Sequence, residues 1–340
     1  MSHLLEVKGL TCAFSGDAGE TVSVDHIDFQ VDEREIVCIV GESGCGKSVT
    51  SLAIMGLLGR GGAVIDGSVS FEGKNLVGLS ERELDEVRGN RISMIFQDPL
   101  TSLNPVFTVG NQITESLRRH KQLSKQEARR QAEEILRRVG MPDAAKTMKK
   151  YPHTLSGGQR QRVMIAMALC CNPALWIADE PTTALDVTIQ AQIMSLLKEL
   201  KEELSMSIIL ITHDIGLVAK MADRVLVMYA GQLVEEAKVK QLFKEPAHPY
   251  TKALLRSVPG IYDDEQRQLA SIPGMVPEQY DRMTGCRFAD RCPYRVSACD
   301  APQPPFLLDN GHWARCHRAK DAALTGRADG TKERAYETGK

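Results

Sequence analysis

The stretch Gly41-Glu42-Ser43-Gly44-Cys45-Gly46-Lys47-Ser48 decides the fold of this chain of 340 residues. It follows an apolar run at 36–40 and precedes a helical pattern at 48–58, which is the strand, loop and helix context of a P-loop. Glycines let successive backbone N–H groups turn toward phosphates at a helix N-terminus. Lys47 would reach the β- and γ-phosphate oxygens, and the Ser48 hydroxyl would bind Mg²⁺. The full eight-residue match outweighs the alternative of a Gly-rich turn without a ligand.

The rest of the chain up to about residue 237 alternates short β-branched runs with helical patterns. The runs lie at 35–40, 91–96, 175–178, 207–212 and 224–228. This alternation predicts an α/β fold with a largely parallel sheet. Periodic apolar residues also predict helices at 188–204 and 124–139. Eight Lys or Arg against three Glu at 117–138 indicate a solvated helical face, from which we infer no function.

Composition and charge exclude several classes of protein. Hydrophobic residues make up 43%, charged residues 25%, and the formal net charge is −2, as in ordinary globular proteins, so the chain as a whole is not disordered. No apolar run approaches the roughly 18 residues of a membrane span, and the first residues lack a signal-peptide pattern, so we expect a cytosolic protein. The near-neutral charge argues against a general nucleic-acid binder.

Three further residues are candidates for nucleotide chemistry. Asp179 and Glu180 follow the apolar run at 174–178, and ligands of open α/β sheets bind at the carboxyl ends of strands. Asp179 would join the Mg²⁺ shell and Glu180 would polarise an attacking water. His213 follows the run at 207–212 and would contact the γ-phosphate; the alternative is a surface histidine that caps the next helix. Cys45, inside the P-loop, is predicted to be a small filler rather than a redox switch.

Four of the nine cysteines gather near the C-terminus, in a Pro-rich segment with little apolar content. They are Cys286, Cys292, Cys299 and Cys316. In a reducing compartment such a group is more typical of a metal site than of disulfides. The spacing matches neither common zinc modules nor the bacterial ferredoxin run, so it does not select the metal.

Residues from about 4 to 237 resemble the nucleotide-binding subunit of an ATP-binding cassette (ABC) transporter. The resemblance rests on the P-loop, Gln97, the signature pentapeptide Leu155-Ser156-Gly157-Gly158-Gln159, the Asp179-Glu180 pair, the loop Ala184-Leu185-Asp186, and His213. It implies a P-loop NTPase of the ABC ATPase type, with a RecA-like core, an antiparallel β subdomain and a helical subdomain at about 98–172. It also implies an ATPase in which two subunits close head-to-tail around two ATP molecules.

The resemblance assigns a role to individual residues. Ser156 and Gly158 of one subunit would face the γ-phosphate bound by the other, Asp186 would couple the two sites, and Phe14 would stack on adenine unless it is a core residue. The implied catalytic residues are Glu180, His213 and Gln97, and the implied Mg²⁺ ligands are Ser48, Gln97 and Asp179. The implied nucleotide contacts are Phe14, Gly41, Ser43, Gly44, Cys45, Gly46, Lys47, Ser48, Val49, Gln97, Ser156, Gly157, Gly158, Gln159, Asp179, Asp186 and His213.

Within this superfamily the chain is most similar to ATPases of dipeptide and oligopeptide importers. The stretches that carry this likeness are 96–105, 178–189, 248–251 and 253–255. They imply peptide uptake with a paralogous ATPase as heterodimer partner, two transmembrane permease subunits contacted through 98–154, and a periplasmic or surface peptide-binding protein. They also imply a peripheral position on the cytoplasmic side of the bacterial inner membrane. Similar ATPases import nickel or glutathione, which stay as alternative cargoes.

The same importers carry a C-terminal extension whose four cysteines bind a [4Fe-4S] cluster, which the resemblance implies for Cys286, Cys292, Cys299 and Cys316. Structural zinc and free thiols are the alternatives. We therefore expect an ATPase domain at 1–258, a Cys-rich extension at 259–318 and a flexible tail at 319–340. Two other functions are weighed: a soluble ABC ATPase that acts on nucleic acid through a zinc module, and a metal-cluster sensor with a vestigial ATPase. The first conflicts with the neutral charge and the second with the intact nucleotide motifs.

Overall fold

The computed structural model describes residues 3–16, 19–96, 103–182, 186–257, 272–309 and 311–321. Gln97, Ala184 and Leu185 lie outside these residues, so the structure does not address their predicted roles. Contacts divide the chain into two compact units that alternate along the sequence. The first unit comprises Met1–Leu5, Gln30–Ile36 and Ser70–Ile211, and the second comprises Glu6–Phe29, Val37–Val69 and Thr212–Lys340.

The first unit contains three parallel strands with β7 (Leu175–Asp179) in the middle. It pairs with β6 (Ile92–Ile95) on one side and β8 (Ser207–Ile211) on the other. Every residue of β7 and β8 is buried, as expected for apolar strands covered on both faces. The predicted runs at 91–96, 175–178 and 207–212 are therefore confirmed as strands of a parallel sheet.

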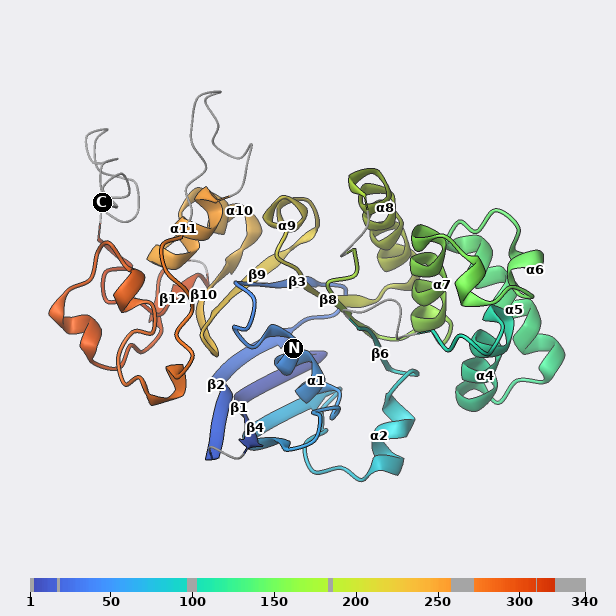
Figure 1. The fold of residues 1–340 in the computed structure, drawn as a ribbon, viewed down its shortest axis with the longest axis horizontal. Helices are drawn as coiled ribbons and strands as arrows, with labels where there is room; N and C mark the ends of the chain where they lie inside the picture. Colours follow the sequence, from blue (N-terminus) through green and yellow to red (C-terminus); the bar gives the residue numbers. More distant parts are fainter. Residues whose placement is uncertain are drawn as a thin grey trace. The chain divides into compact units, whose positions relative to one another are not determined.

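Helices α4 to α7 pack together in the first unit (Figure 1). The helices of this unit are α2 (Glu81–Val87), α4 (Val109–Lys121), α5 (Lys125–Arg138), α6 (Ala144–Thr147), α7 (Gly157–Leu169) and α8 (Val187–Leu204), with a single 3-10 turn η1 (Pro152–Thr154) and a short strand β5 (Lys74–Asn75). The predicted helices at 124–139 and 188–204 are confirmed as α5 and α8. The eight basic residues at 117–138 are all exposed, as the charge pattern indicates.

The second unit contains β3 (Ile36–Val40), whose residues from Val37 onward pair in parallel with β9 (Arg224–Tyr229). On the other side, β9 pairs antiparallel with β10 (Gln232–Lys238). Most of a second sheet also lies here, with strand order β2 (Gly19–Val31), β1 (Leu5–Gly16), β4 (Gly62–Phe71). The helices of this unit are α1 (Lys47–Ile54), α9 (Ile215–Met221), α10 (Val239–Lys244) and α11 (Pro249–Arg256).

Helix α1 is shorter than the predicted span 48–58. It begins at Lys47 and ends at Ile54, because Gly56 adopts a left-handed φ of 62° that stops the helix. Among the described helices none is long and apolar enough to span a bilayer.

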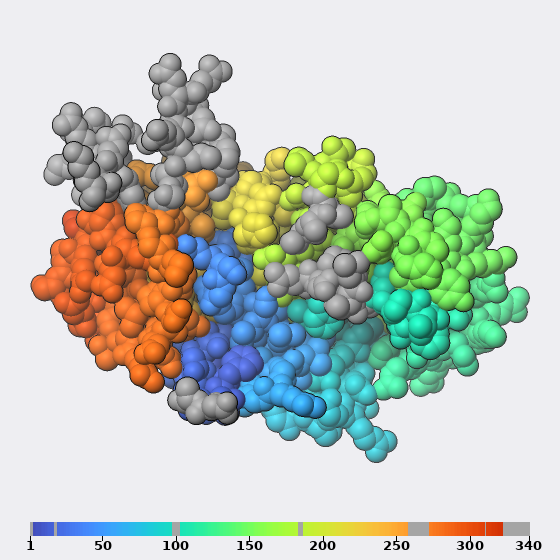
Figure 2. All heavy atoms as spheres, viewed as in Figure 1, coloured from blue at the N-terminus to red at the C-terminus, as the bar shows by residue number. Residues whose placement is uncertain are grey.

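The C-terminal region, 272–309 and 311–321, is built from turns and very short elements. These are η2 (Tyr280–Arg282), η3 (Ala289–Arg291), η4 (Ser297–Asp300), β11 (Phe306–Leu307) and β12 (Trp313–Ala314). Strand β12 pairs antiparallel with β10, so the region extends the sheet of the second unit (Figure 1). Its atoms form a continuous orange-to-red surface in Figure 2. The backbone hydrogen bonds of β12 therefore attach a segment that has little regular structure of its own.

Candidate functional site

The P-loop lies between β3 and α1 in the second unit, and close packing requires glycine at two of its positions. A Cβ atom at Gly41 would lie 2.1 Å from the Met228 carbonyl oxygen. Gly46 has φ of 105°, and a Cβ there would lie 2.8 Å from the Ser23 carbonyl oxygen. Gly46 is also the N-cap of α1, so the loop leads directly into the helix N-terminus, where backbone N–H groups attract anions. The loop therefore has the backbone geometry that phosphate binding requires.

Lys47 and Cys45 both point into this loop. Lys47 is buried, and its Nζ donates to the carbonyl oxygens of Gly41 at 2.8 Å and Glu42 at 2.9 Å. Cys45 is fully buried, and burial raises the pKa of its thiol, which disfavours the reactive thiolate. The structure thus supports the interpretation of Cys45 as a packing residue, while the ammonium group of Lys47 is held by main-chain oxygens of the loop.

Two more predicted site residues lie in the second unit. His213 is exposed and directly precedes Asp214, whose side chain caps α9 by accepting from Leu217 N at 3.0 Å. The alternative that His213 caps this helix is therefore wrong, because Asp214 fills that position. Phe14 is half-buried near the end of β1, where a Cβ on Gly62 would lie 2.6 Å from its ring. Phe14 is thus not a fully buried core residue, and its contact with adenine stays a prediction.

The two carboxylates lie in the first unit. Asp179 is the last residue of β7 and is 3% exposed, so it belongs to the strand itself. Glu180 has φ of 48°, a left-handed conformation that costs a non-glycine residue about 1 kcal/mol. Its backbone N–H donates to Ile211 O at 2.9 Å, which fixes the strained turn to the next strand. Strained backbone is typical of functional sites, because it can direct a side chain to a position that an unstrained backbone would not allow.

The signature pentapeptide forms the start of α7 in the same unit. Ser156 is the N-cap and forms a capping box with Gln159. Gly158 lies close to α8, since a Cβ there would be 3.1 Å from the Ile189 side chain. Buried Gln161 on α7 donates to the carbonyl oxygen of Pro181, next to Glu180. The first unit therefore joins α7, which the signature begins, to the turn that carries Glu180.

Asp186 begins α8. Its carboxylate accepts from Ile189 N at 2.9 Å and so caps the helix. The predicted residues thus fall in two groups, which the structure describes within separate units. Phe14, the P-loop and His213 are in the second unit, and the signature, Asp179, Glu180 and Asp186 are in the first.

All four C-terminal cysteines line one small cavity, which we call the cysteine pocket. Its other walls are mainly apolar, and the enclosed space is about 10 Å³. Burial raises the pKa of the Cys286, Cys292 and Cys316 thiols to about 11. Backbone N–H groups oppose this rise by donating to the sulfurs, among them that of Phe288 to Cys286. The pocket therefore combines clustered thiols with N–H donors that favour the charged form.

A single metal ion does not match this arrangement. Within the described ranges, no three His, Cys, Asp or Glu side chains are arranged to hold one ion. Ligands of one zinc ion must converge within about 2.3 Å of a common point. The cysteines share a cavity without that convergence, and none of the nine forms a disulfide.

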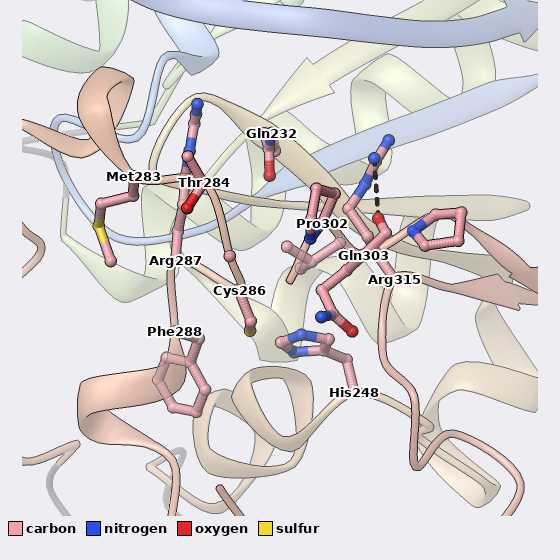
Figure 3. A pocket seen from close by; sticks show the side chains of 13 residues that line it. Gln232, His248, Met283, Thr284, Cys286, Arg287, Phe288, Pro302, Gln303 and Arg315 are labelled. Atoms are coloured by element: carbon pink, nitrogen blue, oxygen red, sulfur yellow. Dashed lines mark hydrogen bonds between the residues drawn. The ribbon is translucent and has the colours of Figure 1, made fainter. Parts of the chain in front are cut away.

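A larger cavity of about 250 Å³ adjoins the cysteine pocket and shares His248, Cys286, Phe288 and Gln303 with it (Figure 3). Two arginines on its wall hold the C-terminal region in place. Arg287 donates to the Asp25 carboxylate and to Ala230 O, and Arg315 donates to the carbonyl oxygens of Leu233 and Gln303. Burial lowers the pKa of both guanidinium groups.

A buried carboxylate, which sequence reasoning missed, links β10 to α11 and to the C-terminal region. Glu235 is fully buried and accepts from Ala247 N at 2.7 Å, His248 N at 2.8 Å and His312 Nε2 at 2.8 Å. His248 in turn caps α11, because its Nδ1 accepts from Tyr250 N at 3.1 Å. No clear signal of this role is present in the sequence, because β10 mixes apolar and polar residues and carries Glu235 and Glu236 side by side.

Exposed apolar side chains occur where the sequence predicts contact with a permease. Val106 is 70% exposed, Phe107 49% and Tyr151 42%. A backbone hydrogen bond from Val109 N to Lys150 O joins the two segments that carry them. The three exposed side chains therefore lie on two segments that the fold joins.

Comparison with known proteins gives consistent matches. Residues 24–183 match the family described as ABC transporter, and residues 234–299 match the oligopeptide/dipeptide transporter C-terminal region. The chain is 53% identical over 318 residues to the oligopeptide transport ATP-binding protein AppD of Bacillus subtilis, covering 93% of this chain and 97% of that protein. It is 51% identical over 313 residues to a putative peptide import ATP-binding protein of Brucella abortus, covering 92% and 94%.

Solved structures of ATP-binding cassettes share the fold. The dimeric cassette MJ0796 in a post-hydrolysis state bound to ADP and phosphate has a TM-score of 0.63 at 30% identity, covering 69% of this chain and 98% of that one. Protein cbiO1 of Clostridium perfringens, part of the transporter complex cbiONQ, has a TM-score of 0.61 at 30% identity, covering 72% and 91%. The α/β fold predicted from the motifs is therefore confirmed as that of an ABC ATPase cassette.

Proposed function

Because the chain belongs to the family of oligopeptide and peptide ABC transporter ATP-binding proteins, we propose that it is the ATPase subunit that powers bacterial uptake of dipeptides and oligopeptides. The observation that carries this proposal is 53% identity along 97% of an oligopeptide transport ATP-binding protein. The relatives are transport proteins, which disfavours the nucleic-acid alternative. The subunit would lie on the cytoplasmic side of the inner membrane, as a peripheral protein.

We propose that MgATP binds at the P-loop. Lys47 would neutralise the β- and γ-phosphates, and Ser48, Asp179 and Gln97 would hold Mg²⁺. Glu180 would polarise the attacking water while His213 and Gln97 orient it and the γ-phosphate. The support is the loop backbone that opens α1 and the strained turn at Glu180. Bound Mg²⁺ would supply charge neutralisation at the leaving phosphate oxygens.

We also propose the assembly that the family implies. A paralogous ATPase would supply its own signature to the γ-phosphate bound here, and Ser156 and Gly158 of this chain would face the nucleotide of the partner. Asp186 would couple the two sites, and Phe14 would stack on adenine. Two permease subunits would dock near the exposed Val106 and Phe107, and a peptide-binding protein outside the membrane would deliver cargo.

For the cysteine pocket we propose a [4Fe-4S] cluster. Four thiols and several N–H donors at their sulfurs form a donor set that suits such a cluster, and hydrogen bonds to sulfur are a general feature of these sites. When bound, the cluster would cross-link a segment with little apolar core. This assigns 1–258 to the ATPase, 259–318 to the cluster extension and 319–340 to a tail.

Metal analysis tests the cluster. Protein purified without oxygen should contain near four iron and four acid-labile sulfide per chain, with a visible absorption spectrum typical of iron-sulfur protein. Cys292→Ser should lose iron and lower the folded yield, whereas Cys170→Ser, outside the pocket, should keep both. One zinc without sulfide would replace the cluster by a zinc site and leave the ATPase assignment intact.

Uptake of labelled dipeptide by a strain lacking this chain tests the proposed function. The wild-type gene should restore uptake, and Glu180→Gln should abolish it because the catalytic carboxylate is lost. The same substitution at exposed Glu199 on α8 should leave uptake unchanged. Restored uptake of nickel or glutathione with no effect on dipeptides would reject peptide as the cargo.

A further inference from the structure

Arg291 connects the cysteine-rich segment to the P-loop. It ends η3 immediately before Cys292, and its side chain is 6% exposed. Its Nη1 donates to Glu42 Oε2 at 2.7 Å and its Nη2 donates to Glu42 Oε1 at 3.0 Å, which is a bidentate pair. Nη1 also donates to the Tyr229 hydroxyl at 3.2 Å. A two-pronged bond fixes the carboxylate in orientation as well as in distance.

Other contacts hold the Arg291 guanidinium in one place. It lies over the rings of Tyr229 and Phe288, 5.8 Å and 5.9 Å from their centroids. Its remaining hydrogen bonds go to the main-chain carbonyl oxygens of Pro273 at 2.7 Å, Gly274 at 3.2 Å and Ile272 at 3.4 Å. The Arg291 side chain is thus held in one position by its contacts and is not a mobile surface group.

Glu42 is the second residue of the P-loop, and its backbone touches the phosphate-binding groups. Its carbonyl oxygen accepts from Lys47 Nζ at 2.9 Å and from Cys45 N at 3.4 Å. Its N–H donates to the Tyr250 hydroxyl at 2.8 Å. The position of Glu42 therefore determines the position of the carbonyl oxygen that binds the Lys47 ammonium.

An aromatic cluster reinforces the same connection. Phe288 is 1% exposed and packs against Tyr229 and Tyr250, with centroids at 5.3 Å and 5.4 Å. Tyr229 and Tyr250 contact each other at 4.6 Å. Phe288 also contributes its N–H to the Cys286 thiol, beside which it lies in Figure 3. One packed cluster therefore touches the cysteine pocket on one side and Glu42 on the other.

We propose that Arg291 is a positioning residue for nucleotide binding, which acts through Glu42 to hold the P-loop and thereby couples the state of the cysteine pocket to ATP affinity. This inference rests on the proposed function, since it assumes that the P-loop binds ATP. When the four cysteines are held together, Arg291 and Phe288 are held against the loop. Release of the cysteines would free Arg291 to leave Glu42, and linkage requires that ATP binding in turn stabilise the pocket.

A binding assay on the full-length chain tests this proposal. MgATP affinity is measured by calorimetry for the wild type, Arg291→Gln, Arg291→Lys, Glu42→Gln and the double variant Arg291→Gln/Glu42→Gln. We expect Arg291→Gln to raise the dissociation constant about tenfold, a coupling of ordinary allosteric size. Arg291→Lys should recover part of the lost ATP affinity, because a lysine ammonium keeps the positive charge but cannot form the bidentate pair with Glu42. The double variant should bind no worse than the weaker single variant.

Controls separate this effect from general damage. Arg295 lies in the same segment but pairs with Asp290 and Asp300 on the surface, so Arg295→Gln should leave ATP affinity within twofold. Cys292→Ser should weaken ATP binding by itself and should not add to Arg291→Gln. Iron content and the unfolding midpoint are recorded for every variant.

Unchanged ATP affinity in Arg291→Gln would overturn the proposal, and so would additive losses in the double variant. In either case, ATP binding by the wild type would still support the proposed function. A wild type that binds no ATP would instead reject the proposed function. For the assembled transporter, Arg291→Gln should raise the KM for ATP and leave kcat within twofold, a split that general destabilisation would not produce.

Discussion

The buried imidazole of His248 makes the stability of the second unit depend on pH. Burial lowers its pKa from 6.5 to about 4, although Glu235 nearby acts to raise it. Its Nδ1 accepts from Tyr250 N at 3.1 Å, and its ring centroid lies 6.0 Å from that of Phe288. As the pH falls, His248 is protonated in the unfolded chain before it is protonated in the folded chain. The stabilisation that the neutral ring contributes to folding is therefore complete above pH 6.5 and is lost as the pH falls toward 4.

The size of this effect follows from the two pKa values. One pKa unit corresponds to 1.36 kcal/mol, so the whole pKa shift of His248 contributes about 3 kcal/mol to the unfolding free energy. Of this, about 2 kcal/mol is lost between pH 7.5 and pH 5.0. His248→Asn keeps a cap acceptor for α11 but cannot titrate. Urea unfolding at both pH values should show that the wild type loses about 2 kcal/mol more than the variant. Equal losses in the two proteins would refute the assignment of a neutral, buried His248.

Two other substitutions test the packing around the site. Gly46→Ala should weaken ATP binding at least tenfold in calorimetry, because its Cβ would lie 2.8 Å from the Ser23 carbonyl oxygen, whereas Gly44→Ala, with nothing within 4 Å, should bind more tightly than Gly46→Ala. Equal affinities would show that close packing is not the cause. Glu235→Leu should lower the unfolding free energy by about 3 kcal/mol, since two backbone amides and the His312 imidazole lose their acceptor. A loss under 1 kcal/mol in urea unfolding would contradict this.

Much of the fold was predictable because its signals are local. The apolar runs became β3, β6, β7, β8 and β9, and the stripe at 188–204 became α8. The P-loop and the signature could be recognised in the sequence because each is a continuous stretch. In both, a residue of the motif, Gly46 or Ser156, is the N-cap of the helix that follows. Helix α1 was predicted too long because apolar periodicity continues past Gly56, whose backbone ends the helix.

Contacts between distant parts of the sequence were not predictable. Arg291 and Glu42 are 249 positions apart, and neither residue type signals the other. Glu235 gave no clear signal, because β10 is a mixed strand with a second glutamate beside it, and the partners of Glu235 come from two separate segments, 247–248 and 312. The four cysteines were grouped correctly because thiols are rare, but their spacing did not reveal the narrow pocket that they share.

The most direct test of the account measures ATP hydrolysis and peptide accumulation in the same proteoliposomes, with the chain assembled with its partner ATPase, the permease subunits and the binding protein. We predict that peptide-loaded binding protein stimulates hydrolysis, that labelled peptide accumulates in proportion, and that Glu180→Gln in this chain stops both. Peptide accumulation that persists in the Glu180→Gln complex would contradict the claim that this chain powers import.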